Sequence, residues 1–328
     1  MLKSASMDAS RSALVADVGG THARFGLVNP QVEGEIAVQR TLFVKDFPTP
    51  VEAFDHYLAD FQPDRRPRTA IVAVAGPPID DIVKMTNGEW VISVAGMASR
   101  MGLDQLYVVN DVAAAGWGML DLDPADLIQL GEKPLDRRTG RFVAIGAGTG
   151  LGVAAVTRDE EGHLTVADSE GGHVDFAPVS EAEDAILAAL RKRFGRVSCE
   201  RLLSGQGLVN IFDALTGSES GLAPEDITTR ADAGDRDAER AIDHFCGMLG
   251  SFAGNLVLMH NARDGLFLDG GVLRAIAGRL VSGPFRQRFD SKGRFSPLLA
   301  EVPALLVRDP AIGLRGAAAA LRDRLVVR

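Results

Sequence analysis

The sequence predicts an α/β protein of two similar halves around a cleft, each with the element order βββαβαβα, and three observations lead to this class. The chain has 328 residues, more than one hydrophobic core usually supports, so two domains are expected. Short apolar runs typical of buried strands alternate with stretches whose apolar residues recur at helical spacing. A strand that ends in a glycine-rich turn occurs near the start of the chain, and a similar one occurs near its middle.

The first half opens with a predicted β-hairpin. The apolar run 13–19 (ALVADVG) is followed by a second extended run at 23–28 (ARFGLV), which makes 19–22 (GGTH) the tip. A helix is predicted at 51–61, where apolar residues follow helical spacing before a proline-containing breaker. The other strands of this half are predicted at 35–44, 69–75 and 106–109.

The same order of elements begins again at Arg141. When Thr149 is laid on Thr21, 128 residues earlier, Gly148 also falls on Gly20. The alternative is that any two glycine-tipped hairpins align this well. Strands are predicted at 142–145, 153–158, 164–167, 265–269 and 304–308, and helices at 181–194, 238–258, directly after Gly271 and at 313–324.

The two halves define the predicted domains. A small domain takes residues 12–122 together with 312–328, because the last helix is expected to pack back on the first half. A large domain takes residues 123–311.

Composition and charge exclude several classes of protein. The net charge of −9 argues against nucleic-acid binding, which needs clustered Lys and Arg. The two cysteines, Cys199 and Cys246, form no C-x-x-C pair, which excludes a disulfide framework and a four-cysteine zinc site. The sequence has neither a secretory signal nor a run of about 18 apolar residues, so we expect a cytoplasmic protein that does not cross a membrane.

The first glycine motif is Asp17-Val18-Gly19-Gly20-Thr21. It places a carboxylate at the end of a buried strand, followed by two residues that permit close backbone approach and by a hydroxyl donor. Such a turn suits a polyphosphate, because glycine amides face its oxygens and Asp17 would hold magnesium through water. The alternative is a simple hairpin turn.

The second glycine cluster, 146–152 (GAGTGLG), matches neither of two well-known phosphate loops. It lacks the Lys-Ser/Thr ending of a P-loop. The third glycine of the dinucleotide fingerprint would fall on Leu151, and a strand rather than a helix is predicted next. One observation still favours a dehydrogenase, since Glu170 lies roughly where a ribose-binding acid would occur.

Two polar residues, Asn110 and Asp111, follow the apolar strand LYVV and precede a run of small residues. Asp111 is the candidate general base, accepting the proton of an attacking hydroxyl during phosphoryl transfer. The alternative is that Asp111 is a helix N-cap.

The segment 169–175 (SEGGHVD) brings two carboxylates, two glycines and an imidazole together. Sugar hydroxyls both donate and accept, so Glu170 and His173 suit a sugar site. A metal site with Asp175 is the rival, but no second nearby His or Cys completes a ligand set. Glu200 is a further hydroxyl acceptor or, alternatively, a solvated helix charge. Gly270 and Gly271, after a buried strand, would let an adenosine ring lie against the backbone, although helix packing explains them nearly as well.

Taken together, these motifs resemble the bacterial glucokinase family of the sugar kinase, Hsc70 and actin superfamily. The resemblance runs from about Leu14 to the last helix. It rests on seven motifs that occur in order: ADVGGTHARF, KMTNGEW, VVNDVAA, GAGTGLGV, EGGHVDFAP, CERLLSGQGL and LDGGV.

The resemblance implies a two-domain actin-like ATPase (ribonuclease-H-like) fold and ATP-dependent phosphorylation of glucose at its 6-hydroxyl, with ATP and Mg²⁺ as cofactors. Domain closure on glucose would exclude water. A homodimer is the default expectation. The implied phosphate-binding and adenosine-binding residues are Ala16, Asp17, Val18, Gly19, Gly20, Thr21, Gly146, Gly148, Thr149, Gly150, Gly270 and Gly271. The implied glucose-binding residues are Asn110, Glu170, His173 and Glu200, with Asp111 as the base.

The chain departs from the family pattern at His22, where the motif often carries Asn, which puts the local phosphate geometry in doubt. The cysteine-rich zinc motif of the related repressor-and-kinase family is absent, which places the chain with the zinc-free glucokinases. The alternatives are a kinase for mannose or fructose, a non-catalytic sugar sensor, and a filament or chaperone ATPase. A DNA-reading module has no room in the sequence, and a filament or chaperone ATPase would not need the EGGH cluster.

Overall fold

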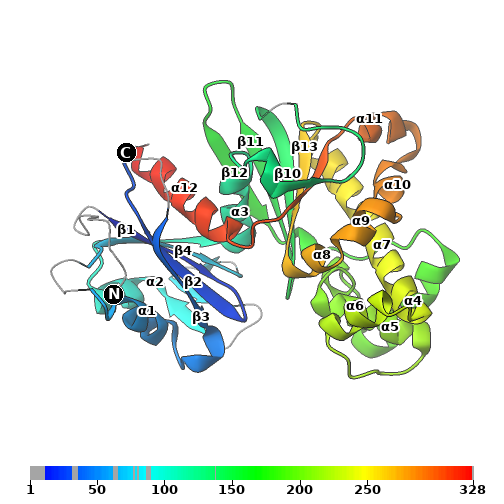
Figure 1. Cartoon of the computed structure of the whole chain (residues 1–328), viewed down its shortest axis with the longest axis horizontal. Helices are drawn as coiled ribbons and strands as arrows, with labels where there is room; N and C mark the ends of the chain where they lie inside the picture. The colour runs from blue at the N-terminus through cyan, green and yellow to red at the C-terminus, as the bar shows by residue number, and fades with distance from the viewer. Residues whose placement is uncertain are drawn as a thin grey trace. The chain divides into compact units, whose positions relative to one another are not determined.

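The computed structural model describes residues 12–31, 36–61, 66–76, 78–79, 81–85, 90–136 and 138–326. The contacts divide the chain into two compact units (Figure 1). Unit 1 comprises Met1–Asp121 and Ala311–Arg328, and unit 2 comprises Leu122–Pro310.

Unit 1 is built on a five-stranded sheet of order β3-β2-β1-β4-β8. Strand β1 pairs antiparallel with β2 and parallel with β4, and β4 pairs parallel with β8. The strands are β1 (Ala13–Val18), β2 (His22–Val28), β3 (Ala37–Phe43), β4 (Thr69–Val74) and β8 (Gln105–Asn110).

Helices cover both faces of this sheet, which explains why β1 is buried along its whole length. Leu14 and Ala16 pack in one apolar cluster with α1 (Pro50–Leu58) and α2 (Val94–Met101). Ala13 and Val15 point to the opposite face, as strand alternation requires, and pack with α3 (Asp111–Met119) and α12 (Ile312–Val326). Because α12 is the last helix of the chain, the C-terminal segment completes the core of unit 1.

A small sheet interrupts the repeated order between β4 and α2, and the sequence did not indicate it. Its strands are β5 (Pro78–Ile79), β6 (Ile82–Lys84) and β7 (Val91–Ser93), in that order. Residues 86–89 of the KMTNGEW motif lie outside the described residues.

Unit 2 repeats the arrangement with a six-stranded sheet of order β12-β11-β10-β13-β14-β9. The first five strands in this order match those of unit 1, so the prediction of two similar α/β halves is confirmed. The strands are β9 (Leu127–Gln129), β10 (Gly140–Ala147), β11 (Leu151–Arg158), β12 (Leu164–Ser169), β13 (Gly265–Asp269) and β14 (Ala304–Val307). The added edge strand, β9, pairs with β14.

The two glycine hairpins differ by one residue, which corrects the alignment at a constant spacing of 128 residues. The last cross-strand pair is Val18 with Ala23 in the first hairpin, and Ala147 with Leu151 in the second. The second connection is therefore one residue shorter. A spacing that aligns the second strands of the hairpins misaligns the first strands by one residue.

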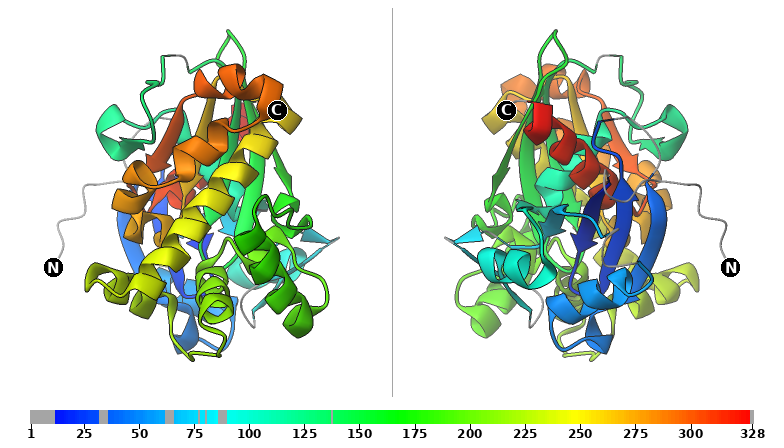
Figure 2. Two further views of the ribbon diagram at one scale, coloured as in Figure 1. Left: turned by 90° about the vertical axis from the view of Figure 1, so that its right-hand side faces the viewer. Right: turned by 90° about the vertical axis from the view of Figure 1, so that its left-hand side faces the viewer.

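The long helix α7 (Arg236–His260) is the central helix of unit 2 and packs against β10 (Figure 2). Among the helices of the described residues, α7 alone is long and apolar enough to cross a membrane, but 72% of its most apolar stretch is buried inside the protein. That burial is typical of a core helix. The other helices of unit 2 are α4 (Glu181–Phe194), α5 (Gly205–Thr216), α6 (Pro224–Asp232), α8 (Gly271–Ala275), α9 (Ala277–Ser282), α10 (Phe285–Asp290) and α11 (Ser296–Ala300).

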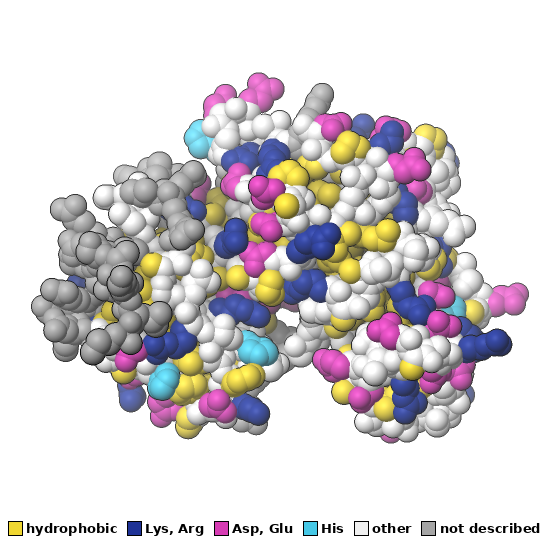
Figure 3. Space-filling model, viewed as in Figure 1, with side chains coloured by type: hydrophobic (Ala, Val, Ile, Leu, Met, Phe, Trp, Pro, Cys, Tyr) yellow, Lys and Arg dark blue, Asp and Glu magenta, His cyan; other side chains and the backbone are white. Residues whose placement is uncertain are grey.

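The surface carries mixed charge. On the face shown in Figure 3, acidic and basic side chains are interspersed, as expected for a chain with 35 Lys and Arg residues and 44 Asp and Glu residues.

Candidate active site

The first glycine hairpin places Asp17 at the end of β1, where its side chain is almost completely buried. Arg24, its cross-strand neighbour on β2, lies 3.4 Å away, measured from Nη1 to Asp17 Oδ2. A side chain at Gly313 would place its Cβ 2.9 Å from the carboxyl carbon of Asp17, so the carboxylate lies against the first turn of α12. The positive end of the helix dipole and the guanidinium both stabilise a negative charge there.

The tip of this hairpin is closed by a hydrogen bond from the Gly19 amide to the His22 carbonyl, at 2.9 Å. The imidazole of His22 packs on the ring of Phe43, with 5.0 Å between ring centroids. The tip spans Gly19 to His22, as predicted, because the last pair between β1 and β2 is Val18 with Ala23. His22 is also the first residue of β2, since it pairs with Phe43 on β3.

Asn110 and Asp111 lie at the end of β8, where the strand passes directly into α3. Asn110 is the N-cap, because its Oδ1 accepts hydrogen bonds from the amides of Val112 and Ala113 at 2.9 and 3.1 Å. Asp111 is the first residue of the helix, and its Oδ1 accepts from Val112 at 2.8 Å. The alternative that Asp111 is the N-cap is therefore wrong.

The pairing register relates Asp17 to Asn110. Asp17 is level with Ala73 on β4, and Ala73 is level with Val109 on β8, the residue before Asn110. Adjacent strands lie about 4.8 Å apart. The Cα atoms of Asp17 and Asn110, two strands apart, are therefore separated by about 10 Å at the carboxyl ends of the parallel strands. The sheet thus brings the unit 1 candidates to a single edge.

The second glycine cluster lies at the end of β10 and is fixed by one hydrogen bond within the turn and one from the neighbouring helix α5. The Gly148 amide donates to the Gly150 carbonyl at 2.9 Å, and the Gly148 carbonyl accepts from the amide of Gly205 at 2.8 Å. Gly205 is the first residue of α5, whose N-cap is Ser204.

The glycine pair after β13 lies against the same turn. Gly146 is level with Asp269 in the parallel pairing of β10 with β13. Gly270 has φ +134°, and a Cβ at that position would lie 1.8 Å from the carbonyl oxygen of Ala147. Gly270 therefore packs against the backbone of Ala147, the residue directly before the turn Gly148-Thr149-Gly150.

The sugar-site candidates of unit 2 form a cluster centred on His173. Nε2 of His173 lies 3.6 Å from Oε2 of Glu170, and Nδ1 lies 3.9 Å from Oε1 of Glu200. Glu170 is exposed, His173 is 41% exposed, and Glu200 is 21% exposed, so the cluster is open to a ligand. Two carboxylates on either side of an imidazole provide several acceptors and a group that can both donate and accept.

A neighbouring segment positions the backbone around His173. Arg196 donates from Nη2 to the His173 carbonyl at 2.6 Å, and its Nε lies 2.7 Å from Oδ1 of Asp175. The Cys199 amide donates to the Val174 carbonyl at 2.9 Å. Sequence reasoning did not find the role of Arg196, because nothing in its local pattern indicates a partner 23 residues away.

Arg274 joins the ends of two neighbouring strands of unit 2. Asp269 at the end of β13 pairs with Arg274 of α8, and Arg274 also donates to the Val307 carbonyl at the end of β14. Within the described ranges, no group of three His, Cys, Asp or Glu residues has the arrangement of a metal site.

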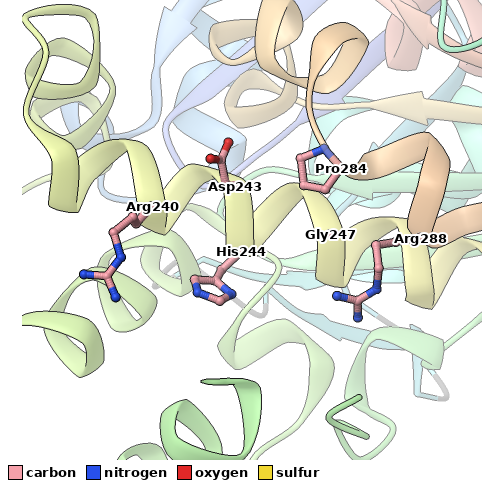
Figure 4. A pocket seen from close by; sticks show the side chains of 6 residues that line it. All are labelled: Arg240, Asp243, His244, Gly247, Pro284 and Arg288. Carbon is pink, nitrogen blue, oxygen red and sulfur yellow. The ribbon is translucent and has the colours of Figure 1, made fainter. Parts of the chain in front are cut away.

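A hollow of about 320 Å³ lies elsewhere on unit 2, along one face of α7 (Figure 4). It is lined by Arg240, Asp243, His244, Gly247, Pro284 and Arg288. The side chains of Arg240, His244 and Arg288 point to the same side in Figure 4, whereas Asp243 points away. Both arginines of the hollow already have acidic partners. Arg288 pairs with the buried Glu183 at 2.7 Å, and Arg240 pairs with Asp237 at 3.1 Å.

Comparisons with known proteins agree with this architecture. The family model described as Glucokinase matches residues 14–324. The chain is 42% identical to a glucokinase from Xylella fastidiosa (strain 9a5c), over 94% of this chain and 95% of that protein. Among solved structures, the crystal structure of a glucokinase from an Antarctic psychrotroph has a TM-score of 0.81 and 34% identity, covering 95% of this chain and 99% of that one.

A more distant structure shares the fold. It is a ROK family glucokinase from Streptomyces griseus in complex with glucose and AMPPNP. Its TM-score is 0.64 at 22% identity, and the alignment covers 94% of this chain and 98% of that one.

Proposed function

The chain belongs to the glucokinase family, and from this premise we propose that it transfers the γ-phosphoryl group of ATP to the 6-hydroxyl of glucose, giving glucose 6-phosphate and ADP. The observation that carries the proposal is the cluster of Glu170, His173 and Glu200, which adjoins a glycine turn suited to phosphate. A sugar site and a phosphate site on the same unit are what a sugar kinase needs.

Four residues are proposed to bind the hydroxyls of glucose. Glu170 and Glu200 would accept hydrogen bonds from sugar hydroxyls, His173 would donate or accept, and Asn110 would bind a further hydroxyl. The amide of Asn110 is already oriented, because its Oδ1 accepts two backbone amides of α3, which leaves its NH₂ group as the donor for the sugar. A fixed donor loses little conformational entropy when the ligand binds.

Asp111 is proposed as the general base that accepts the proton of the 6-hydroxyl as phosphoryl transfer proceeds. The Val112 amide donates to Asp111 Oδ1 at 2.8 Å, which fixes the carboxylate at the first turn of α3. Fixed placement supports catalysis, because a reacting hydroxyl is then oriented toward the phosphoryl group rather than toward solvent.

The nucleotide is proposed to bind at the two glycine turns. In unit 1 the binding residues are Ala16, Asp17, Val18, Gly19, Gly20 and Thr21, and in unit 2 they are Gly146, Gly148, Thr149 and Gly150. Backbone amides in such turns form concave anion sites. Gly270 and Gly271 are proposed to contact the adenosine.

Magnesium is proposed to bind mainly to phosphate oxygens and water, with Asp17 contributing through a water molecule. The surroundings of Asp17 fit only such an indirect role, because Arg24 and the first turn of α12 already balance much of its charge. Bound in this way, the ion would neutralise charge on the transferring phosphoryl group.

Three further expectations from the sequence are also proposed. The protein acts in the cytoplasm, it forms a homodimer, and it binds neither nucleic acid nor membranes.

The test is to measure ADP release by the purified protein with ATP and magnesium against glucose, mannose, fructose and N-acetylglucosamine. We expect glucose to give by far the highest turnover, and Asp111→Ala to lose activity by about a hundredfold or more. Asp184→Ala is the matched control, because it also removes a first-turn helix carboxylate but lies on α4. Preference for another hexose would favour the alternative kinase, and no stimulation by any sugar would favour a sensor.

A further inference from the structure

The carboxylate of Glu200 has two neighbours of different function. Its Oε1 lies 3.9 Å from Nδ1 of His173, in the sugar cluster. Its Oε2 accepts a hydrogen bond of 3.0 Å from the backbone amide of Leu151, the residue that directly follows the turn Gly148-Thr149-Gly150. One side chain thus connects the proposed sugar site to the proposed phosphate turn.

We propose that Glu200 binds the sugar and also positions the nucleotide. It would position the nucleotide by fixing the backbone of Leu151, next to the phosphate turn. The proposal rests on the proposed function, since it assigns the phosphates to this turn. It goes further in giving a sugar-site residue a measurable effect on nucleotide binding in the absence of sugar.

The backbone of Leu151 has few alternatives to this hydrogen bond. Leu151 is 5% exposed, so water does not replace Glu200 as the acceptor for its amide without rearrangement. On its other side, the Leu151 carbonyl oxygen packs against Gly172, where a Cβ would come within 1.9 Å. The Glu200 side chain and the EGGH segment therefore hold the same residue from two directions.

The backbone of Glu200 is itself anchored to the phosphate turn. Its carbonyl accepts from the hydroxyl of Ser204 at 2.9 Å, and the same hydroxyl accepts from the Gly207 amide at 3.1 Å as the N-cap of α5. The next residue, Gly205, donates its amide to the Gly148 carbonyl at 2.8 Å. The segment Glu200–Gly205 thus contacts both ends of the turn, at Gly148 and at Leu151.

Glu170 offers a matched comparison within the same cluster. It is the same residue type, it faces the same imidazole at 3.6 Å, and it is proposed to bind the same sugar. The carboxylate of Glu170 contacts His173, whereas that of Glu200 contacts His173 and also binds the Leu151 amide. Removing either carboxylate should weaken sugar binding, but only removal of Glu200 should disturb the phosphate turn.

The test uses two separate calorimetric titrations of the protein, one with AMPPNP and magnesium in the absence of sugar and one with glucose alone. We expect Glu200→Ala to weaken AMPPNP binding by about tenfold or more, because a buried amide is left without its acceptor. Glu170→Ala should bind AMPPNP within about twofold of the wild type while binding glucose more weakly. Glu200→Gln keeps an acceptor oxygen for Leu151 and should restore most of the AMPPNP affinity but not the glucose affinity.

Equal AMPPNP affinity in Glu200→Ala, Glu170→Ala and the wild type would overturn the proposal. If Glu200→Ala does not fold, Ser204→Ala replaces it, compared with Ser180→Ala, which removes the N-cap hydroxyl of α4 instead. Weaker AMPPNP binding in Ser204→Ala alone supports the proposal, and equal binding in the two serine variants overturns it. The sugar panel decides the proposed function separately, because the AMPPNP titrations contain no sugar.

Discussion

Arg196 donates a hydrogen bond of 2.6 Å from Nη2 to the backbone carbonyl of His173, the residue at the centre of the candidate sugar site. Its Nε lies 2.7 Å from Asp175, in a pair exposed to solvent. Exposed ion pairs contribute about 0–1 kcal/mol to stability, so the pair with Asp175 adds little to the stability of the fold. The main effect of Arg196 is therefore to position His173 through the hydrogen bond to its carbonyl.

We therefore predict that Arg196→Ala raises the KM for glucose by about three- to tenfold, equivalent to about 1 kcal/mol, with little change in the KM for ATP. Steady-state kinetics with each substrate varied in turn will measure both values. Arg68→Ala is the control, because it removes another exposed arginine that pairs with an aspartate, Asp104, at 2.6 Å. Equal effects on both KM values would show that Arg196 acts on the whole enzyme rather than on the sugar site.

The sequence predicted the long and regular elements well. Helix α4 and strand β13 have the predicted bounds, 181–194 and 265–269, because each combines a clear periodicity with a clear start and end. Helix α5 was missed, since its first turn contains Gly205 and Gly207, residues with low helix propensity. The strands β5 to β7 have two or three residues each, too few to establish an alternating pattern.

For the candidate site, too, the sequence predicted some features and missed others. The motifs indicated which glycines, carboxylates and imidazole to consider, because seven such motifs occur in order along the chain, although each alone has a structural alternative. The contacts that organise them could not be predicted, since the partners are backbone groups far away in sequence, as with Glu200 and the amide of Leu151. The one-residue difference between the two hairpins was also hidden, because it is defined by strand pairing rather than by composition.

Gly270 provides a test of the packing at the end of β13. Its φ of +134° lies in a region that only glycine adopts readily, and a Cβ would lie 1.8 Å from the Ala147 carbonyl oxygen. We predict that Gly270→Ala lowers the free energy of unfolding by about 3 kcal/mol or more, measured by urea denaturation.

The adjacent glycine is the control for this substitution. A Cβ at Gly271 would meet no heavy atom within 4 Å, and Gly271 is the first residue of α8. Gly271→Ala should therefore change stability by less than about 1 kcal/mol. Similar losses in the two variants would contradict the assignment of strain to Gly270 alone.

Both cysteine thiols should be unreactive in the native protein. Burial raises the pKa of the Cys199 thiol to about 12, with a smaller contribution from the nearby Asp175. Burial raises the pKa of the Cys246 thiol to about 12 as well, with Asp243 adding to it. Because the thiolate is the reactive form, we predict that a disulfide reagent at pH 8 labels neither thiol until the protein is unfolded, when both react. Rapid labelling of Cys199 in the native state would show that the segment around Glu200 opens readily.

Stability should fall on mild acidification because of His244, which lies half-buried beside the hollow on α7. Burial lowers the pKa of this imidazole; Arg240 and Arg288 act in the same direction, whereas Glu183 and Asp243 oppose them. A histidine whose pKa is lower in the folded state than in the unfolded chain binds fewer protons when folded, so folding stability decreases as the pH falls below the unfolded pKa of about 6.5. Above that pH the imidazole is neutral in both states and contributes no pH dependence.

We predict that the free energy of unfolding, measured by urea denaturation from pH 7.5 to pH 5, falls more steeply in the wild type than in His244→Gln, which cannot titrate at this position. The two curves should differ in slope only below about pH 6.5, since the protonation difference exists only there. His163→Gln is the control, because it removes an imidazole that is 74% exposed. If His244→Gln has the same slope as the wild type, the acid sensitivity comes from other groups and the burial of His244 has no net effect on folding.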